Sequence, residues 1–165
     1  MMSPHPSRFK PHIRHPIAIG DGEHVCIIDV GSIGAMRVEA EVIFSRFPGG
    51  LPDEFELVFS IACRSGGSEV IYFDGRQSKH VLPNRQDRTA IMTAICDAVR
   101  LLISITSPRL LAFMTYSPDL PDKALVKYRH VIALLEESGY CRVKETLMYG
   151  RLSWTMERDG DQASA

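Results

Sequence analysis

Basic side chains gather around Asn84, where a turn-rich stretch gives way to a helical pattern. They are Arg76, Lys79, His80, Arg85 and Arg88. Asn84 is a residue type that caps helix N-termini, and such a terminus attracts phosphate and other anions through its free N–H groups and its dipole. A solvated loop is the simpler interpretation of this cluster, and an anion or cofactor site at the helix N-terminus is the alternative. The residues that would form the site are Lys79, Arg85, Arg88, Thr89 and Ala90.

Other groups of residues that could form a catalytic or metal site give less specific signals. No serine or cysteine stands in a nucleophile-elbow motif. The four cysteines are far apart and form no CxxC pair, which argues against a zinc site and against the dense disulfides of small secreted proteins. His12 and His15 have no third ligand beside them. We therefore expect no metal site, and free thiols in a reducing compartment.

Length and charge set the broad class. The 165 residues match one domain, large enough to bury a core without disulfides or metal. A formal net charge of −1 gives no overall field that would favour nucleic acid or a membrane. No apolar run reaches the ~18 residues of a membrane span. These features predict a cytoplasmic protein without membrane contact, and they argue against a nucleic-acid partner.

The chain divides into three expected parts. Residues 1–20 contain Pro4, Pro6, Pro11 and Pro16 and several basic side chains, which predicts a flexible arm. Residues 21–158 form a single α+β domain, and residues 159–165 a disordered tail. Deleting residues 1–16 is expected to change the free energy of unfolding by less than roughly 0.5 kcal/mol.

Hydrophobic periodicity predicts the elements of the domain. Apolar or alternating residues predict strands at 25–28, 38–44, 55–63 and 70–73. A stripe of apolar residues at three- and four-residue steps predicts a helix that begins after Asn84 and ends before Pro108.

The C-terminal half continues with a strand at 110–116, a second helix from about residue 122, and strands at about 141–147 and 152–157. Gly139 fits the left-handed position that ends a helix. The order β-β-β-β-α-β-α-β-β predicts an α+β fold with a mixed, mostly antiparallel sheet and two main helices. We expect a crossover between parallel strands across residues 70–116. The strand at 110–116 should be central, with both helices packed on it.

This order resembles the core of the GNAT superfamily, the acyl-CoA-dependent N-acyltransferases. The resemblance spans about residues 25–158 and rests on two short motifs near the C-terminus. They are Leu134-Leu135-Glu136-Glu137-Ser138-Gly139-Tyr140, similar to the family's helix end, and Trp154-Thr155-Met156-Glu157-Arg158, similar to its last strand. The resemblance implies an acyl-CoA N-acyltransferase-like fold, with acetyl-CoA as the cofactor of an active member.

The cofactor motif of the family is degenerate in this chain. The family's pyrophosphate loop reads Gln/Arg-x-x-Gly-x-Gly/Ala, and the corresponding residues here are Arg85-Gln86-Asp87-Arg88-Thr89-Ala90. Arg88 replaces the central glycine, whose bare backbone would approach the phosphates, and Asp87 adds a negative charge. The tyrosine that serves the family as general acid, four residues before the helix-ending glycine, is Leu135 here.

Two functions follow as hypotheses. The first is a non-catalytic binding or regulatory domain on a degenerate acyltransferase-like scaffold, without a cofactor, that acts through contacts with another protein; homo-oligomer formation stays open. The second is a divergent N-acyltransferase that uses acetyl-CoA through Arg85 and Arg88, in which the resemblance implies Glu41 or Glu56 as general base. The degenerate loop favours the first, and we expect no useful affinity for acetyl-CoA.

Overall fold

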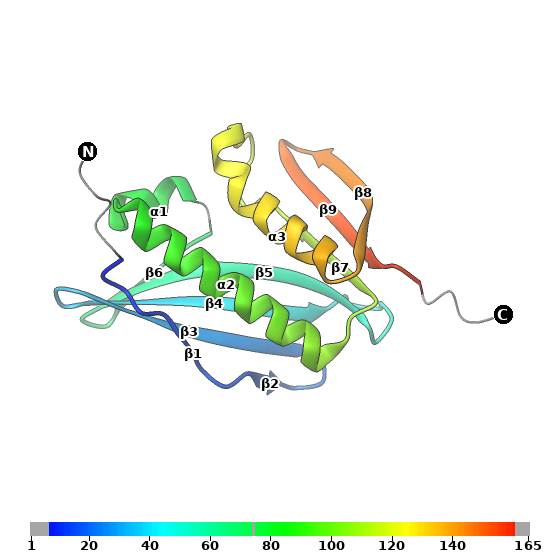
Figure 1. Ribbon diagram of the computed structural model, residues 1–165, viewed down its shortest axis with the longest axis horizontal. Coiled ribbons are helices and arrows are strands. Elements are labelled where there is room, and N and C mark those ends of the chain that lie inside the picture. The colour runs from blue at the N-terminus through cyan, green and yellow to red at the C-terminus, as the bar shows by residue number, and fades with distance from the viewer. Residues whose placement is uncertain (1–6, 74, 161–165) are drawn as a thin grey trace.

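The computed structural model describes residues 7–73 and 75–160 and contains a large twisted sheet with helices on one face (Figure 1). Most of the predicted tail, residues 161–165, lies outside the described residues. The strands are β1 (His12–Ile13), β2 (Ile17–Ile19), β3 (Glu23–Ile33), β4 (Met36–Arg46), β5 (Glu54–Ser65), β6 (Ser68–Tyr72), β7 (Leu110–Met114), β8 (Tyr140–Met148) and β9 (Arg151–Arg158). The helices are α1 (Gly75–Val81), α2 (Arg85–Thr106), the short 3-10 helix η1 (Asp122–Leu125) and α3 (Val126–Glu137).

The strands form one sheet in the order β1-β3-β4-β5-β7-β9-β8, with β2 paired to β3 and β6 to β5. All the pairs within the described residues are antiparallel except β5 with β7. The prediction of a mixed, mostly antiparallel α+β fold is therefore confirmed. The period-two pattern of the central strands explains it, because alternate residues such as Val42 and Phe44 are fully buried under the helices.

The parallel pair differs from the predicted one. β6 pairs only with β5, and β7 runs parallel to β5 instead, through the pairs Glu54–Leu110, Phe55–Leu111 and Glu56–Ala112. Beyond these three pairs β5 and β7 are not hydrogen-bonded to each other, and the two strands separate. The segment between β6 and α2 was expected to be a turn, but it forms α1.

β7 lies inside the sheet between β5 and β9, as predicted for a strand rich in apolar residues. α2 packs on β3 and β4, whereas the prediction placed it on β7. On α3, Tyr128 stacks on Trp154 of β9, which in turn stacks on Phe113 of β7. α2 and α3 lie next to each other on the same side of the sheet (Figure 1).

The ends of α2 follow the sequence signals. The side chain of Asn84 accepts a hydrogen bond of 2.8 Å from the Gln86 backbone N–H, and the helix stops at Ser107, in left-handed conformation just before Pro108. By length and composition α2 would also be able to cross a bilayer. Its apolar stripe, which includes Ile91, Ala98 and Leu102, instead packs in the core.

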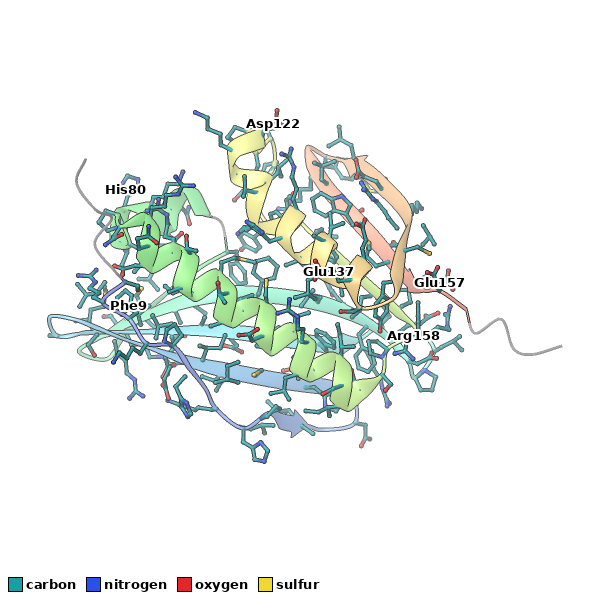
Figure 2. All side chains as sticks on the ribbon, in the orientation of Figure 1. Phe9, His80, Asp122, Glu137, Glu157 and Arg158 are labelled. Carbon is teal, nitrogen blue, oxygen red and sulfur yellow. The ribbon has the colours of Figure 1, made fainter. Side chains whose placement is uncertain are left out.

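Residues 7–19 pack against the domain, whereas the prolines predicted a flexible arm. Phe9 is only 6% exposed and belongs to the main core, beside the start of α2 (Figure 2). Its ring fills the space next to Gly31, where an added Cβ would come within 2.8 Å of Phe9 Cδ1. β1 and β2 then add to the outer edge of β3. Prolines exclude a helix but permit such extended edge strands.

An ion-pair network ties this segment to the sheet. Arg14 donates to Asp29 at 2.8 Å and 2.6 Å and to Glu39 at 3.1 Å, and Arg37 donates to Asp29 at 3.0 Å. The hydrogen bonds from Arg14, followed by that from Arg37, lower the pKa of Asp29 from 3.8 to about 2. Because the folded-state pKa lies below the unfolded value, the stabilisation is complete above about pH 4 and is lost as the pH falls through about 2.

We therefore expect an NMR titration to place the pKa of Asp29 at about 2 in the folded protein. Arg14→Ala should raise it toward 3.8, because the strongest donor is lost. Arg100→Ala, which changes a half-exposed arginine of α2 outside this network, serves as the control and should leave it unchanged. A wild-type value near 3.8 would contradict the network.

Candidate functional site

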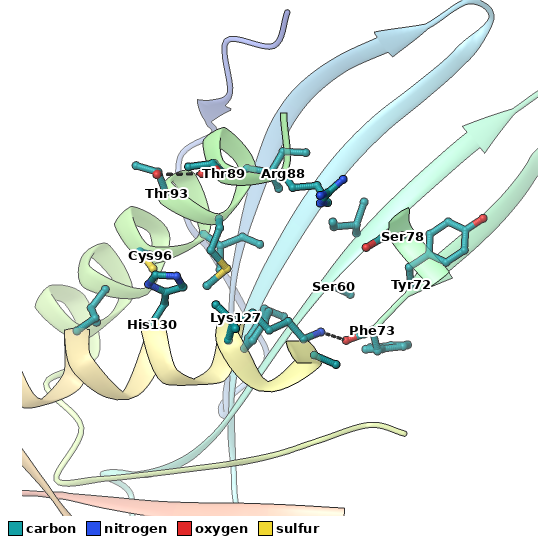
Figure 3. A pocket seen from close by; sticks show the side chains of 18 of the residues that line it. Ser60, Tyr72, Phe73, Ser78, Arg88, Thr89, Thr93, Cys96, Lys127 and His130 are labelled. Carbon is teal, nitrogen blue, oxygen red and sulfur yellow. Dashed lines mark hydrogen bonds between the residues drawn. The ribbon is translucent and has the colours of Figure 1, made fainter. Parts of the chain in front are cut away.

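A cavity of about 770 Å³ lies between α2 and α3, above β5 (Figure 3). Its walls come from elements far apart in the sequence, namely β5, β6, α1, the N-terminal half of α2, η1 and α3. The lining side chains include Phe59, Ile61, Tyr72, Phe73, Ser78, Lys79, Arg85, Arg88, Thr89, Ile91, Met92, Ile95, Cys96, Lys123, Lys127, His130 and Leu134. Of these residues, Lys79, Arg85, Arg88 and Thr89 were predicted from the sequence.

The cavity combines an apolar floor with a positively charged rim. Phe59, Ile91 and Leu134 are buried at the floor. Lys79, Arg85 and Lys123 line the cavity and are exposed, and within the described residues none of them forms an ion pair. A cation without an acidic neighbour favours an anion from solution, so the site suits a ligand with both a negatively charged and an apolar part.

Arg88 projects from the first turns of α2 into the cavity, where one of its guanidinium nitrogens donates to the carbonyls of Leu82 and Pro83 at 2.7 Å and 2.6 Å. The guanidinium thus stands beside the chain that leads into the N-terminus of α2. Thr89 lines the same cavity, and its hydroxyl donates to the Arg85 carbonyl at 3.0 Å.

Asp87 does not face the cavity. Its side chain is fully buried and accepts hydrogen bonds from the Ser7 hydroxyl at 2.9 Å and the Arg8 backbone N–H at 3.1 Å. The Arg8 guanidinium completes the set, with Nε at 3.0 Å from Oδ2. Asp87 therefore does not present its charge to the cavity, because Ser7 and Arg8 of the N-terminal segment bind this carboxylate.

The wall formed by α3 carries a second cationic group. Lys127 donates to the Phe73 carbonyl, and its ammonium lies 5.4 Å from the ring centroid of Phe59 and 4.9 Å from that of Tyr128 (Figure 3). These contacts fix the position of a positive charge at the mouth of the cavity.

Cys96 and His130 also line the cavity, from α2 and α3 (Figure 3). Cysteine acts as a nucleophile in the thiolate form. Burial raises the pKa of the Cys96 thiol above its usual value, which favours the protonated form. This pair therefore does not have the electrostatics of an activated cysteine.

A smaller cavity of about 250 Å³ occupies the gap between β5 and β7. It is lined by Glu56, Leu57, Val58, Phe59, Phe73, Met114, Tyr116, Tyr128 and Arg151. It shares Phe59 and Phe73 with the larger cavity, and Phe73 stacks on Tyr116 with ring centroids 4.3 Å apart.

The predicted site residues separate into two groups. Lys79, Arg85, Arg88 and Thr89 converge on the larger cavity, whereas Ala90 is not among its lining residues. The side chain of Arg76 lies outside the described residues. Glu56 lines the smaller cavity, but Glu41 pairs with Ile27 and Ser60 across the sheet and lines neither cavity.

Leu135, at the position where the acyltransferase resemblance would place an acid, is fully buried in the core. Sequence reasoning missed Lys123, Lys127 and His130. They recur at three- and four-residue steps, which places them on one helix face, so their spacing was a usable signal.

Within the described residues no three His, Cys, Asp or Glu side chains are grouped so that they could hold a metal ion. No family model matches the chain, and no curated protein or solved structure is significantly similar to it.

Proposed function

We propose that this chain is a binding domain whose cavity between α2 and α3 holds a phosphorylated small molecule with an extended apolar arm, the class that includes acyl-coenzyme A. The carrying observation is the pairing of an apolar floor with Lys79, Arg85 and Lys123, which have no acidic partner within the described part of the chain. The strand order, with a parallel pair that parts beside the cavity, supports the acyltransferase-like resemblance.

The anionic end of the ligand would lie at the N-terminal end of α2. Arg85 and Lys79 would supply charge-assisted hydrogen bonds, each contributing about 1.5–3 kcal/mol. Arg88 would take the role that bare glycine backbone has in the family. The apolar arm would pass Phe59 toward the gap between β5 and β7.

This proposal revises the expectation of no affinity for acetyl-CoA. One objection, the charge of Asp87, is removed because Ser7 and Arg8 bind that carboxylate away from the cavity. The loss of the acid at Leu135 bears on catalysis and leaves binding unaffected. The one remaining argument against binding of acetyl-CoA is that Arg88 stands where the acyltransferases have a glycine. The guanidinium of Arg88 is itself able to donate hydrogen bonds to phosphate.

A divergent N-acyltransferase is the second candidate, favoured by the position of Glu56. This carboxylate lines the gap between β5 and β7 together with Tyr116 and Tyr128. A carboxylate there would be able to accept the proton of an attacking amine. Glu41 lines neither cavity and is not part of this candidate.

Isothermal titration of the full chain with acetyl-CoA, coenzyme A and ADP tests the proposal. We expect micromolar binding of acetyl-CoA and coenzyme A, because several cations and an apolar floor act together. Arg85→Ala should weaken it about 10- to 100-fold, the equivalent of one charge-assisted hydrogen bond. Arg129→Ala, an exposed arginine of α3 that does not line the cavity, is the matched control and should bind normally.

Flat titrations with all the probes would contradict the proposal, as would equal weakening by the two arginine variants. If ADP binds as tightly as coenzyme A, only the nucleotide and phosphate end of the ligand contributes to binding. Release of free thiol from acetyl-CoA in the presence of an amine, abolished by Glu56→Gln, would favour the N-acyltransferase over the binding domain.

A further inference from the structure

Positive charge is concentrated at one end of the cavity between α2 and α3, although the formal net charge of the chain is −1. The cations that line this end are Lys79, Arg85, Arg88, Lys123 and Lys127. Among the described lining residues the one acid is Glu137. Its carboxylate lies 4.0 Å from Arg100, which is about 22 Å further along α2 than Arg85. The excess of positive charge among the lining residues is therefore confined to one end.

These cations stand on two walls that face each other across the cavity. Lys79, Arg85 and Arg88 come from α1 and the start of α2 and form what we call the α2 wall. Lys123 and Lys127 come from η1 and α3 and form the α3 wall. Figure 3 shows Arg88 and Lys127 on the two opposite sides. The two groups of charges are therefore separate.

The α2 wall offers several side-chain donors to an anion. One guanidinium nitrogen of Arg88 is bonded to two backbone carbonyls, and its other N–H groups have no partner among the described residues. Ser78 is only 5% exposed, and its hydroxyl faces the cavity without a hydrogen-bond partner in the described part of the chain (Figure 3). A buried hydroxyl of this kind gains a partner when a polar ligand binds. The backbone N–H groups of Gln86 and Arg88 are already bonded to Asn84, so side chains would hold the anion.

The α3 wall presents two ammonium groups to a second position. Lys123 is exposed and forms no ion pair or hydrogen bond with any described residue. Its neighbour Asp122 does not line the cavity and lies 3.9 Å from Arg129. Lys127 donates to the Phe73 carbonyl, which keeps its charge on this wall.

The charge on the two walls exceeds what one phosphate group neutralises. Lysine and arginine side chains are protonated at neutral pH, so the walls together carry five positive charges. A phosphate monoester carries about 1.5 to 2 negative charges at pH 7. A single phosphate or diphosphate on the α2 wall would leave the lysines of the α3 wall uncompensated. A ligand with a second, separate phosphate neutralises both walls.

We propose that the cavity selects ligands with two separate phosphate groups, a diphosphate on the α2 wall and a phosphate monoester on the α3 wall beside Lys123. The diphosphate belongs on the α2 wall because that wall has more donors. The inference rests on the proposed function and narrows its ligand class to molecules such as coenzyme A, which carries a 3′-phosphate on its ribose in addition to its diphosphate. Lys123 is then a specificity-determining residue.

Isothermal titration of the full chain with coenzyme A and 3′-dephospho-coenzyme A tests the second position. The two probes differ only in the 3′-phosphate, so coenzyme A should bind about 10- to 100-fold more tightly. Lys123→Ala should weaken the binding of coenzyme A about 10-fold and leave the dephospho form unchanged. Arg85→Ala, on the α2 wall, should weaken both probes by the same factor.

Lys144→Ala is the matched control, because Lys144 is an exposed lysine of β8 that does not line the cavity. It should bind both probes as the wild type does, and circular dichroism establishes that each variant is folded. AMP and adenosine 3′,5′-bisphosphate form a second pair of probes without the apolar arm. The bisphosphate should bind more tightly than AMP, and Lys123→Ala should remove this preference.

Phosphorus NMR locates the monoester without relying on affinity. A phosphate monoester has a second pKa of about 6, and a neighbouring ammonium group lowers it by favouring the dianion. The pKa of the 3′-phosphate should therefore be lower in bound than in free coenzyme A. Lys123→Ala should return it toward the free value.

The outcomes separate this inference from the proposed function. Equal affinity for coenzyme A and its dephospho form would overturn the second phosphate position while leaving the proposed function intact. A Lys123→Ala variant that binds both probes normally, or that weakens both equally, would do the same. Flat titrations with every probe would contradict the proposed function and this inference together.

Discussion

Replacing Phe9 with alanine should lower the free energy of unfolding by about 3–5 kcal/mol, the usual cost of removing a buried phenylalanine. The ring is 6% exposed and fills the space that Gly31 leaves open on β3. Gly31 has a φ of +145°, and an added Cβ would come within 2.8 Å of the ring. Chemical denaturation of the folded full chain measures the change.

Lys10→Ala is the matched control, because Lys10 is an exposed neighbour of Phe9. We expect its effect to be within about 0.5 kcal/mol. An equally small effect for Phe9→Ala would mean that the N-terminal segment does not pack stably against the domain. A loss of several kcal/mol would instead exclude the expectation that residues 1–16 contribute little to stability.

Replacing Asp87 with alanine should lower the free energy of unfolding by roughly 2–3 kcal/mol. This carboxylate receives hydrogen bonds from the Ser7 hydroxyl and the Arg8 backbone, and it also lies in the first turn of α2, where a negative charge interacts favourably with the helix dipole. Hydrogen bonds to charged groups contribute about 1.5–3 kcal/mol each, but Arg8 is half-exposed and regains water when the carboxylate is removed.

A double-mutant cycle with Phe9→Ala separates local from shared effects. Both residues hold the same N-terminal segment, so the effect of Asp87→Ala should shrink when Phe9 is already removed. Asp97→Ala provides the comparison on the same helix, where an exposed pair with Arg100 contributes at most about 0.5 kcal/mol. Strict additivity of Asp87→Ala and Phe9→Ala would mean that the carboxylate acts only on α2.

The proposed site shows where sequence reasoning fell short. Arg85 and Arg88 were found because they follow a capping residue, and that local pattern placed them at a helix N-terminus. Asp87 was misjudged, because adjacent helical residues point in directions about 100° apart. The carboxylate of Asp87 and the guanidinium of Arg88 therefore serve different sides of α2, and only the packing of Ser7 and Arg8 reveals which side is which.

The sequence by itself determined the elements that depend on short-range patterns. Alternation placed β4 and β5, a three- and four-residue stripe placed α2, and Asn84, Pro108 and Gly139 marked where helices begin or end. These signals are local because backbone conformation, side-chain periodicity and capping involve residues within one or two turns of each other.

Only the tertiary structure decided how distant elements meet. It paired β7 with β5 instead of β6, and it brought Lys123 of η1 and Lys127 of α3 to the same cavity as Arg85. It also docked Phe9 against Gly31, although the prolines around Phe9 predicted a free arm. These outcomes depend on which buried surfaces fit together best, and that fit is a sum over residues far apart in the chain that no local pattern records.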